Sequence, residues 1–144
     1  MGLLSRLTGM TSTKKPTDDV LLVHAMLLMA GADGYIDDEE IATVEGFAMT
    51  LPEFKERDFG DVIADAQKMV RKYPSLKESV NALTEFSSQA LKTKAFVLAA
   101  DIALASGDVD DNEDQLLTTM QRLLNVDDQT AQTVIWVLSL KYAK

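Results

Sequence analysis

The feature that most constrains this chain is a short acidic motif that occurs twice, each time after a long apolar segment. Residues 34–40 read GYIDDEE and residues 107–113 read GDVDDNE. The two copies lie 73 residues apart, a spacing that indicates a duplicated half-domain and not a short-period array. We therefore expect two similar units, each made of an apolar helix, an acidic corner and an amphipathic helix.

The negative charge of the chain is concentrated in these two corners. Asp33–Glu40 contains five acidic residues and no Lys or Arg, and Asp108–Asp114 contains five more. The whole chain has 14 basic and 23 acidic residues and a formal net charge of −9, so the remaining sequence is close to neutral. This balance argues against non-specific nucleic-acid binding, which needs a basic surface to displace counterions.

Length and composition indicate one ordinary globular domain. A chain of 144 residues buries roughly 70% of the surface that its unfolded state exposes. It has no cysteine, which excludes disulfides and thiolate zinc sites and suits a reducing compartment. Its apolar runs are shorter than the ~20 residues that cross a bilayer, so no transmembrane segment is expected.

Residues 1–16 are predicted to form a flexible or weakly amphipathic arm before a helical domain at residues 17–144. Three leucines could line one side of a short helix, and three basic residues make this the basic end of the chain. These residues are Leu3, Leu4, Leu7, Arg6, Lys14 and Lys15. Two interpretations stay open: a mobile terminus, or weak contact of residues 1–15 with an anionic membrane surface or a partner.

The periodicity of the domain predicts an all-α fold, a single compact bundle of about seven helices with two buried central helices. The first central helix, about Asp19 to Ala32, is apolar on every side, which is typical of a fully buried helix. His24 lies within it and is interpreted as a hydrogen-bonded packing residue. The second central helix, Lys94 to Ala105, is rich in alanine and should pack beside the first.

Capping residues and prolines predict the other helix boundaries. Capping boxes are expected at Asp37/Glu40, Ser75/Glu78 and Asp110/Glu113, with further helix starts near Asp58 and Asp127. The helix that begins at Ser75 is expected to include Leu83, Phe86 and Ala90, with a break somewhere between Ser87 and Lys94. In the last helix Trp136 and Leu140 fall outside the inward stripe, which predicts an exposed apolar patch.

The corners hold more acidic residues than helix capping requires. Capping explains four of them, and the others would repel one another by roughly 0.7 kcal/mol per pair at ~6 Å in bulk water. The residues left unexplained are Asp33, Asp38, Glu39, Asp108, Asp111 and Asp114. A divalent cation would offset this repulsion, because calcium and magnesium prefer carboxylate and carbonyl oxygens. The alternative is a set of caps with solvated neighbours.

Glycine and aliphatic residues in the corners carry structural predictions of their own. Gly34 and Gly107 allow a sharp turn, and Ile36 and Val109 could plug each turn into the core.

A normal EF-hand does not fit. If Glu40 took the last position of that twelve-residue loop, Met29 and Gly31 would occupy positions that require oxygen side chains.

The repeated pattern resembles the TerB family of tellurite-resistance proteins, whose fold also occurs at the N-terminus of the DjlA co-chaperones. The family signature is an apolar helix followed by A-D-G-x-I-x-x-x-E, present twice in an all-helical domain. Residues 32–40 match it well, whereas the second copy has Ser106 in place of the Asp and keeps Gly107, Val109 and Glu113. The resemblance covers about Asp18 to Lys144.

The resemblance implies a bacterial stress-response protein, cytoplasmic or peripheral to the inner membrane, with acidic residues proposed as a divalent-metal site. Carried over by position, the expected ligands are Asp33, Asp37, Glu40 and Glu113; charge and position add Asp108 and Asp110. The cation would be calcium, magnesium or zinc. No catalytic role is predicted, and other proteins are the expected partners. The alternative is a metal-independent, co-chaperone-like adaptor whose acidic residues meet a basic partner.

Two further expectations concern how the corners are placed. The shared-site hypothesis requires Glu40 and Glu113 to lie in one neighbourhood. Asp101, on the second central helix, either joins that acidic site or hydrogen-bonds to neighbours, and the second interpretation is favoured because a buried carboxylate needs partners.

Overall fold

The computed structural model describes residues 16–32, 36–73 and 75–144. Within them, seven α-helices and two short 3₁₀ segments form an all-α fold without strands, as predicted. The α-helices are α2 Asp18–Ala30, α3 Asp38–Ala48, α4 Phe59–Lys72, α5 Leu76–Asn81, α6 Gln89–Ala105, α7 Asp111–Leu123 and α8 Asp128–Lys141. The 3₁₀ segments are Pro52–Phe54 and Ala82–Glu85.

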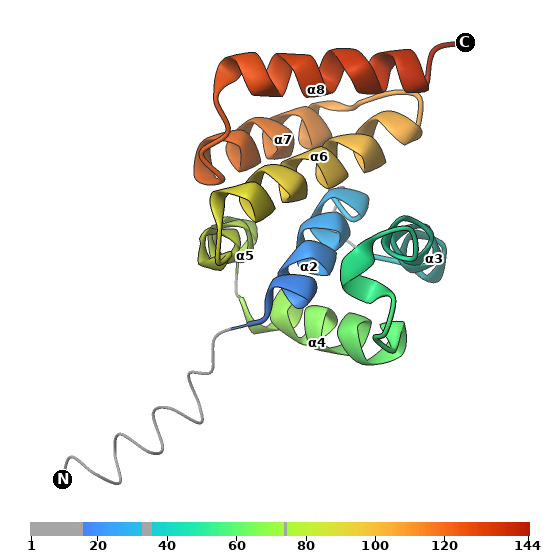
Figure 1. Ribbon diagram of the computed structural model, residues 1–144, viewed down its shortest axis with the longest axis vertical. Coiled ribbons are helices and arrows are strands. Elements are labelled where there is room, and N and C mark those ends of the chain that lie inside the picture. Colours follow the sequence, from blue (N-terminus) through green and yellow to red (C-terminus); the bar gives the residue numbers. More distant parts are fainter. Residues whose placement is uncertain (1–15, 33–35, 74) are drawn as a thin grey trace, which may run out of the picture.

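Helix α2 lies at the centre of the molecule, with α3, α4 and α5 around it and α6 across one end (Figure 1). Every residue from Val20 to Met29 is buried, so the prediction of a helix without a solvent face is confirmed. Its closest neighbours are α6 and α4. Small side chains on α6, among them Ala95, Ala99 and Ala103, are fully buried, which allows close approach of the two central helices.

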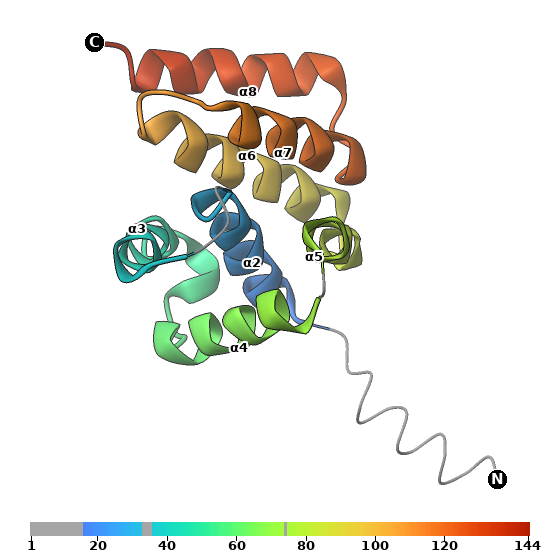
Figure 2. The same ribbon diagram turned by 180° about the vertical axis from the view of Figure 1, so that it is seen from behind.

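The C-terminal half is a stack of α6, α7 and α8, whose axes run side by side in both views (Figures 1 and 2). Helices α7 and α8 each pack on α6, and they pack less closely on each other. The inward residues of α8 are Ala131 and Leu138. No helix within the described ranges has the length and hydropathy that a membrane crossing requires.

Helix starts follow the predicted caps. The side chains of Asp37, Asp58, Ser75, Ser88, Asp110 and Asp127 each accept a hydrogen bond from a backbone N–H of the first turn. Such a cap stabilises a helix by about 1 kcal/mol, because it satisfies a donor that has no partner within the helix. The predicted starts at Asp37, Asp58, Ser75, Asp110 and Asp127 are therefore confirmed.

The boundary between α5 and α6 differs from the prediction. The helix that begins after Ser75 ends at Asn81 and passes through a 3₁₀ segment, after which Phe86 is extended and buried. Ala90 belongs to α6, which starts at Gln89 and not at Lys94. The cause is the cap at Ser88, whose hydroxyl accepts a hydrogen bond from the Leu91 amide at 3.2 Å.

His24 is a buried packing residue, as predicted. Its Nε2 lies 2.8 Å from the carbonyl oxygen of Ser79, which can only accept, so Nε2 carries the proton. Burial lowers the pKa of His24, and the hydrogen bond to Ser79 offsets only part of that effect. Nδ1 is buried with no hydrogen-bond partner in the described part of the chain, so a proton there would be costly.

Candidate functional site

The second acidic corner is a tight turn between α6 and α7 that depends on one glycine. Gly107 has φ +93°, a conformation that strains any residue with a Cβ atom. Ser106 stabilises the turn locally, because its hydroxyl donates to the carbonyl of Ala103 at 2.9 Å or to that of Asp108 at 3.1 Å. These local contacts fix the direction in which the following carboxylates leave the backbone.

Asp110 and Glu113 then form a complete capping box at the start of α7. Oδ1 of Asp110 accepts from the Glu113 amide at 2.8 Å, and Oε1 of Glu113 accepts from the Asp110 amide at 3.1 Å. The capping prediction is therefore confirmed for this corner. Each cap bond uses one oxygen of its carboxylate.

Acidic residues of this corner and residues at the end of α2 line one small pocket. Its volume is about 280 Å³, and three of its lining residues are Asp108, Asp110 and Glu113. The rest of the lining is Ser106 together with Met29, Ala30 and Ala32 from the end of α2 and the residues after it. The fold thus places the end of the first apolar helix, α2, beside the second acidic corner. The repeated sequence pattern did not predict this arrangement.

The electrostatics of this acidic pocket favour a positive charge. Helices α2 and α6 both end beside it, and neither has a basic residue in its last turn. A helix C-terminus carries about half a negative charge from its carbonyl groups. No Lys or Arg is among the described residues that line this pocket.

The donor atoms fit a hard divalent cation. Carboxylate, hydroxyl and backbone carbonyl oxygens are the ligands that calcium and magnesium prefer. Zinc prefers imidazole and thiolate, but the chain has no cysteine and its single histidine is buried in α2. In the described parts of the chain, however, no three Asp, Glu or His side chains form a ready-made metal cluster.

The first acidic corner is described only in part. Asp33, a predicted ligand, and Gly34 lie outside the described residues. Asp37 caps α3 by accepting from the Glu40 amide at 2.9 Å, and Ile36 packs against the core as predicted. Among the described residues, Asp37 and Glu40 are not part of the lining of the acidic pocket.

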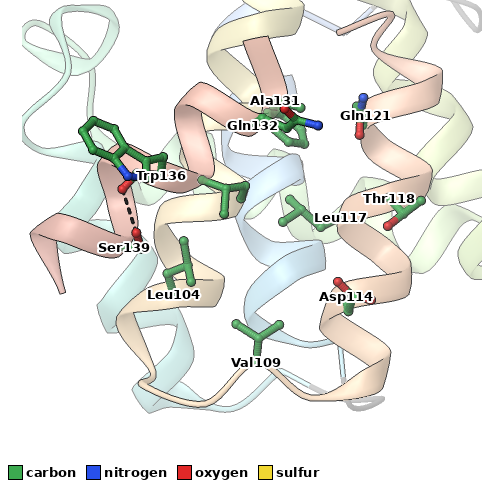
Figure 3. Close-up of a pocket in the computed structure, with 12 residues that line it drawn as sticks. Leu104, Val109, Asp114, Leu117, Thr118, Gln121, Ala131, Gln132, Trp136 and Ser139 are labelled. Carbon is green, nitrogen blue, oxygen red and sulfur yellow. Dashed lines mark hydrogen bonds between the residues drawn. The ribbon is translucent and has the colours of Figure 1, made fainter. Parts of the chain in front are cut away.

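The counterpart of Ile36 behaves differently. Val109 is 40% exposed, so the prediction that it plugs its turn into the core is wrong. Its side chain instead lines one end of an apolar groove between α7 and α8 (Figure 3). Sequence reasoning missed this groove, although it marked the exposed residues Trp136 and Leu140, which are 64% and 57% exposed.

Asp101 does not line the acidic pocket; it ties α6 to the end of α8. Its carboxylate lies 3.0 Å from Nζ of Lys141 and also accepts from the Tyr142 hydroxyl. The hydrogen bond to Asp101 raises the pKa of Lys141, and burial raises the pKa of Tyr142. The favoured interpretation of Asp101, a carboxylate with nearby hydrogen-bond partners, is confirmed.

Comparison with known proteins identifies the family of this chain. Neither the curated proteins nor the solved structures contain a match to this chain. The sequence model described as "Tellurite resistance protein TerB" matches residues 19–134, which include both acidic corners and the helices between them. The chain belongs to the TerB family.

Proposed function

We propose that this chain is a non-enzymatic, TerB-type stress-response module whose acidic pocket binds a divalent cation. The observation that supports it is the convergence of Asp108, Asp110 and Glu113 on the C-terminal end of α2. A cation there would neutralise the carboxylates and the negative ends of two helices together. Binding would therefore link the two halves of the repeat through one pocket.

Oxygen chemistry narrows the choice of cation. The pocket is lined by three acidic residues and by Ser106, with no histidine or cysteine among its described residues. Met29 contributes a thioether, a soft ligand that suits neither calcium nor magnesium. Zinc binds best where imidazole or thiolate ligands are present. We therefore expect this pocket to favour calcium and magnesium over zinc more than a nitrogen-rich site would. Asp33, a further predicted ligand, lies outside the described residues.

A catalytic role has little support from these side chains. The single histidine, His24, is fully buried and donates to a backbone carbonyl, so it is not available as a general base. The Ser106 hydroxyl lies beside the acidic pocket, but it donates to backbone carbonyls and not to a base that could activate it. We therefore propose binding and not turnover.

Thermal unfolding of metal-stripped protein tests the proposal. Calcium, magnesium and zinc are added separately at increasing concentration, and the melting temperature is recorded. A ligand at 100 times its dissociation constant stabilises the native state by about 2.7 kcal/mol, which is readily visible. The Asp65→Asn variant, which removes an exposed carboxylate on α4, should respond like the parent. No change with any cation at millimolar concentration would contradict the proposal.

A metal-independent adaptor is the second candidate, and the exposure of the second corner favours it. Asp108, Asp110, Asp111 and Asp114 are all exposed, so a partner with a basic patch could contact them directly. Association with such a partner would survive chelation and weaken in high salt, because charge pairs at an interface rim are screened. Loss of the partner on chelation would favour the cation-dependent module instead.

A further inference from the structure

The apolar groove between α7 and α8 has the shape of a trough for one short helix. Helix α7 presents Asp114, Leu117, Thr118 and Gln121 along one wall, at helical spacings of three and four residues. The opposite wall is formed by five residues of α8, and Phe96 and Leu104 of α6 form the floor. The α8 residues are Ala131, Gln132, Ile135, Trp136 and Ser139. Figure 3 shows the two walls with Val109 at one end.

The groove exists because of how the last three helices pack. Both α7 and α8 rest on α6, and they pack less closely on each other, so a cavity of about 540 Å³ remains between them. Most of its lining is apolar, yet Trp136 on its wall is 64% exposed. From Asp114 to Gln121 the wall covers two helical turns, or about 12 Å at 1.5 Å per residue.

A segment of matching length and chemistry exists in the same chain. Residues 1–15, which lie outside the described residues, contain Leu3, Leu7 and Met10 at positions i, i+4 and i+7, with Leu4 beside them. This is the spacing by which an amphipathic helix anchors in an apolar groove. From Leu3 to Met10 such a helix would also cover two turns, about 12 Å.

Two hydrogen bonds lead from the start of the domain toward the Gln121 end of the groove. Oδ1 of Asp18 accepts from the Ser87 amide at 3.0 Å, just before the start of α6. Gln89, in the first turn of α6, donates to the carbonyl of Leu124 at 3.0 Å, and Leu124 follows the groove residue Gln121 by three positions. The six residues from Met10 to Pro16 span up to about 20 Å when fully extended.

Charge favours the same pairing. Residues 1–15 contain three basic residues and no acidic one, whereas the rest of the chain has 11 basic and 23 acidic residues. The far end of the groove, at Val109 and Asp114, adjoins the second acidic corner. A helix that enters from the Gln121 end would direct Arg6 and the positive end of its dipole toward those carboxylates, with Lys14 and Lys15 at the Gln121 end.

We propose that residues 1–15 dock into the apolar groove between α7 and α8 of the same chain, with Leu3, Leu7 and Met10 as anchors. The docked arm covers the exposed apolar wall of α8. The inference is independent of whether the acidic pocket binds a cation.

Paramagnetic relaxation on the full chain tests the docking. The chain has no cysteine, so Ser5→Cys accepts a single spin label, on the side of the arm helix opposite the leucines. Amide signals of the groove residues Thr118, Gln121 and Gln132 should broaden, whereas Thr43 and Thr50 near α3 should not. Broadening spread evenly over both sets would overturn the proposal.

Two further samples separate the other occupants. In a mixture of labelled protein without ¹⁵N and unlabelled protein with ¹⁵N, groove signals should stay sharp; broadening there would show that a second copy supplies the arm. Vesicles of phosphatidylglycerol and phosphatidylcholine test the membrane. If arm contacts arise only with vesicles and the groove is unaffected in vesicle-free buffer, the arm is a membrane anchor and the proposal is wrong.

Trp136, the single tryptophan of the chain, provides an independent measurement on the groove. In Leu7→Asp its fluorescence emission should shift to longer wavelength, and acrylamide should quench it more strongly, because the arm no longer covers the groove. Ser5→Asp is the matched control, since it adds the same charge on the opposite side of the arm helix. Identical emission and quenching in the parent and both variants would contradict docking.

Discussion

The two acidic corners have related sequences and different roles in the structure. The described part of the first corner gives a cap at Asp37 and a core contact at Ile36. The second corner has the same cap at Asp110, but it exposes Val109, and its acidic residues line a pocket at the end of α2. The cap residues Asp37 and Asp110 therefore have equivalent roles in the two halves. The aliphatic residues before them do not, because Ile36 packs against the core and Val109 is exposed.

This difference shows how a duplicated unit can build one site from unequal parts. The first half contributes the end of a helix, through Met29, Ala30 and Ala32. The second half contributes the polar and acidic residues Ser106, Asp108, Asp110 and Glu113. The negative end of a helix and a group of carboxylates do not stabilise each other, so the proposed cation is what would make the arrangement favourable.

The largest expected effect comes from neutralising the second corner. Asp108→Asn, Asp110→Asn and Glu113→Gln together should lower cation affinity at least about 100-fold, since loss of a single outer-shell group costs ~10–100-fold. Asn and Gln still form a capping box, so helix α7 should keep its start. Isothermal titration calorimetry measures the affinity.

The matched variant is Asp37→Asn with Glu40→Gln in the first corner. It should retain most of the cation affinity if the corners differ as described. An equal loss in the two variants would break the comparison, because it would mean that the carboxylates of both corners contact the ion.

The second prediction uses a polar residue that only the first half has in its core. His24 corresponds to Val97 in the repeat, and burial holds the pKa of His24 below its usual value of 6.5. The folded state then binds fewer protons than the unfolded state as pH falls below 6.5. Stability should be unaffected by His24 above that pH and should fall below it, by up to about 1.4 kcal/mol per pH unit.

Urea denaturation from pH 8 to pH 5 measures this dependence. His24→Gln can still donate to Ser79 but does not titrate, so its stability should depend less steeply on pH below 6.5. Parallel curves for the two proteins would show that His24 contributes nothing to the pH dependence.

The third prediction concerns what the two corners share. Asp37→Ala and Asp110→Ala should each lower the free energy of unfolding by about 1 kcal/mol in metal-free buffer, because each removes an N-cap. Only Asp110→Ala should also weaken cation binding. Urea denaturation of both variants in EDTA measures the loss of stability. A loss confined to one variant would show that the two caps are not equivalent.

Restoring the residue that the first corner carries gives the smallest expected effect. Ser106→Asp places a carboxylate at the position of Asp33 and should raise cation affinity by up to about tenfold, the attraction of one more charge at ~6 Å in water. Without cation it should destabilise the fold by about 0.3–1 kcal/mol, because it adds negative charge at the end of α6. Unchanged affinity in calorimetry would place Ser106 outside the coordination shell.

Much of the fold was predictable because it depends on local chemistry. The all-round apolarity of α2 predicts burial, and single residues such as Asp58 and Asp127 fix helix starts through their own hydrogen bonds. The turn between Phe86 and Ser88 was placed only approximately, because it contains no glycine or proline and depends on Phe86 entering the core.

The candidate site was predictable in its residues and less so in its geometry. Glu113 and Asp110 follow from the capping pattern, but the position of Ala32 and Met29 opposite them depends on how α2 packs on α6. The groove beside Trp136 arises in the same way, from two helices that rest on a third. Such features follow from tertiary packing and leave no local pattern in the sequence.

The most direct test is a residue-resolved NMR titration of metal-free protein with calcium and with magnesium. We predict that the amide signals of Asp108–Glu113 and of Met29–Ala32 shift together with one dissociation constant, while those of Asp127–Thr130, another acidic helix start, stay in place. Signals that remain unchanged at millimolar cation, or shifts of equal size at every acidic helix start, would contradict the account.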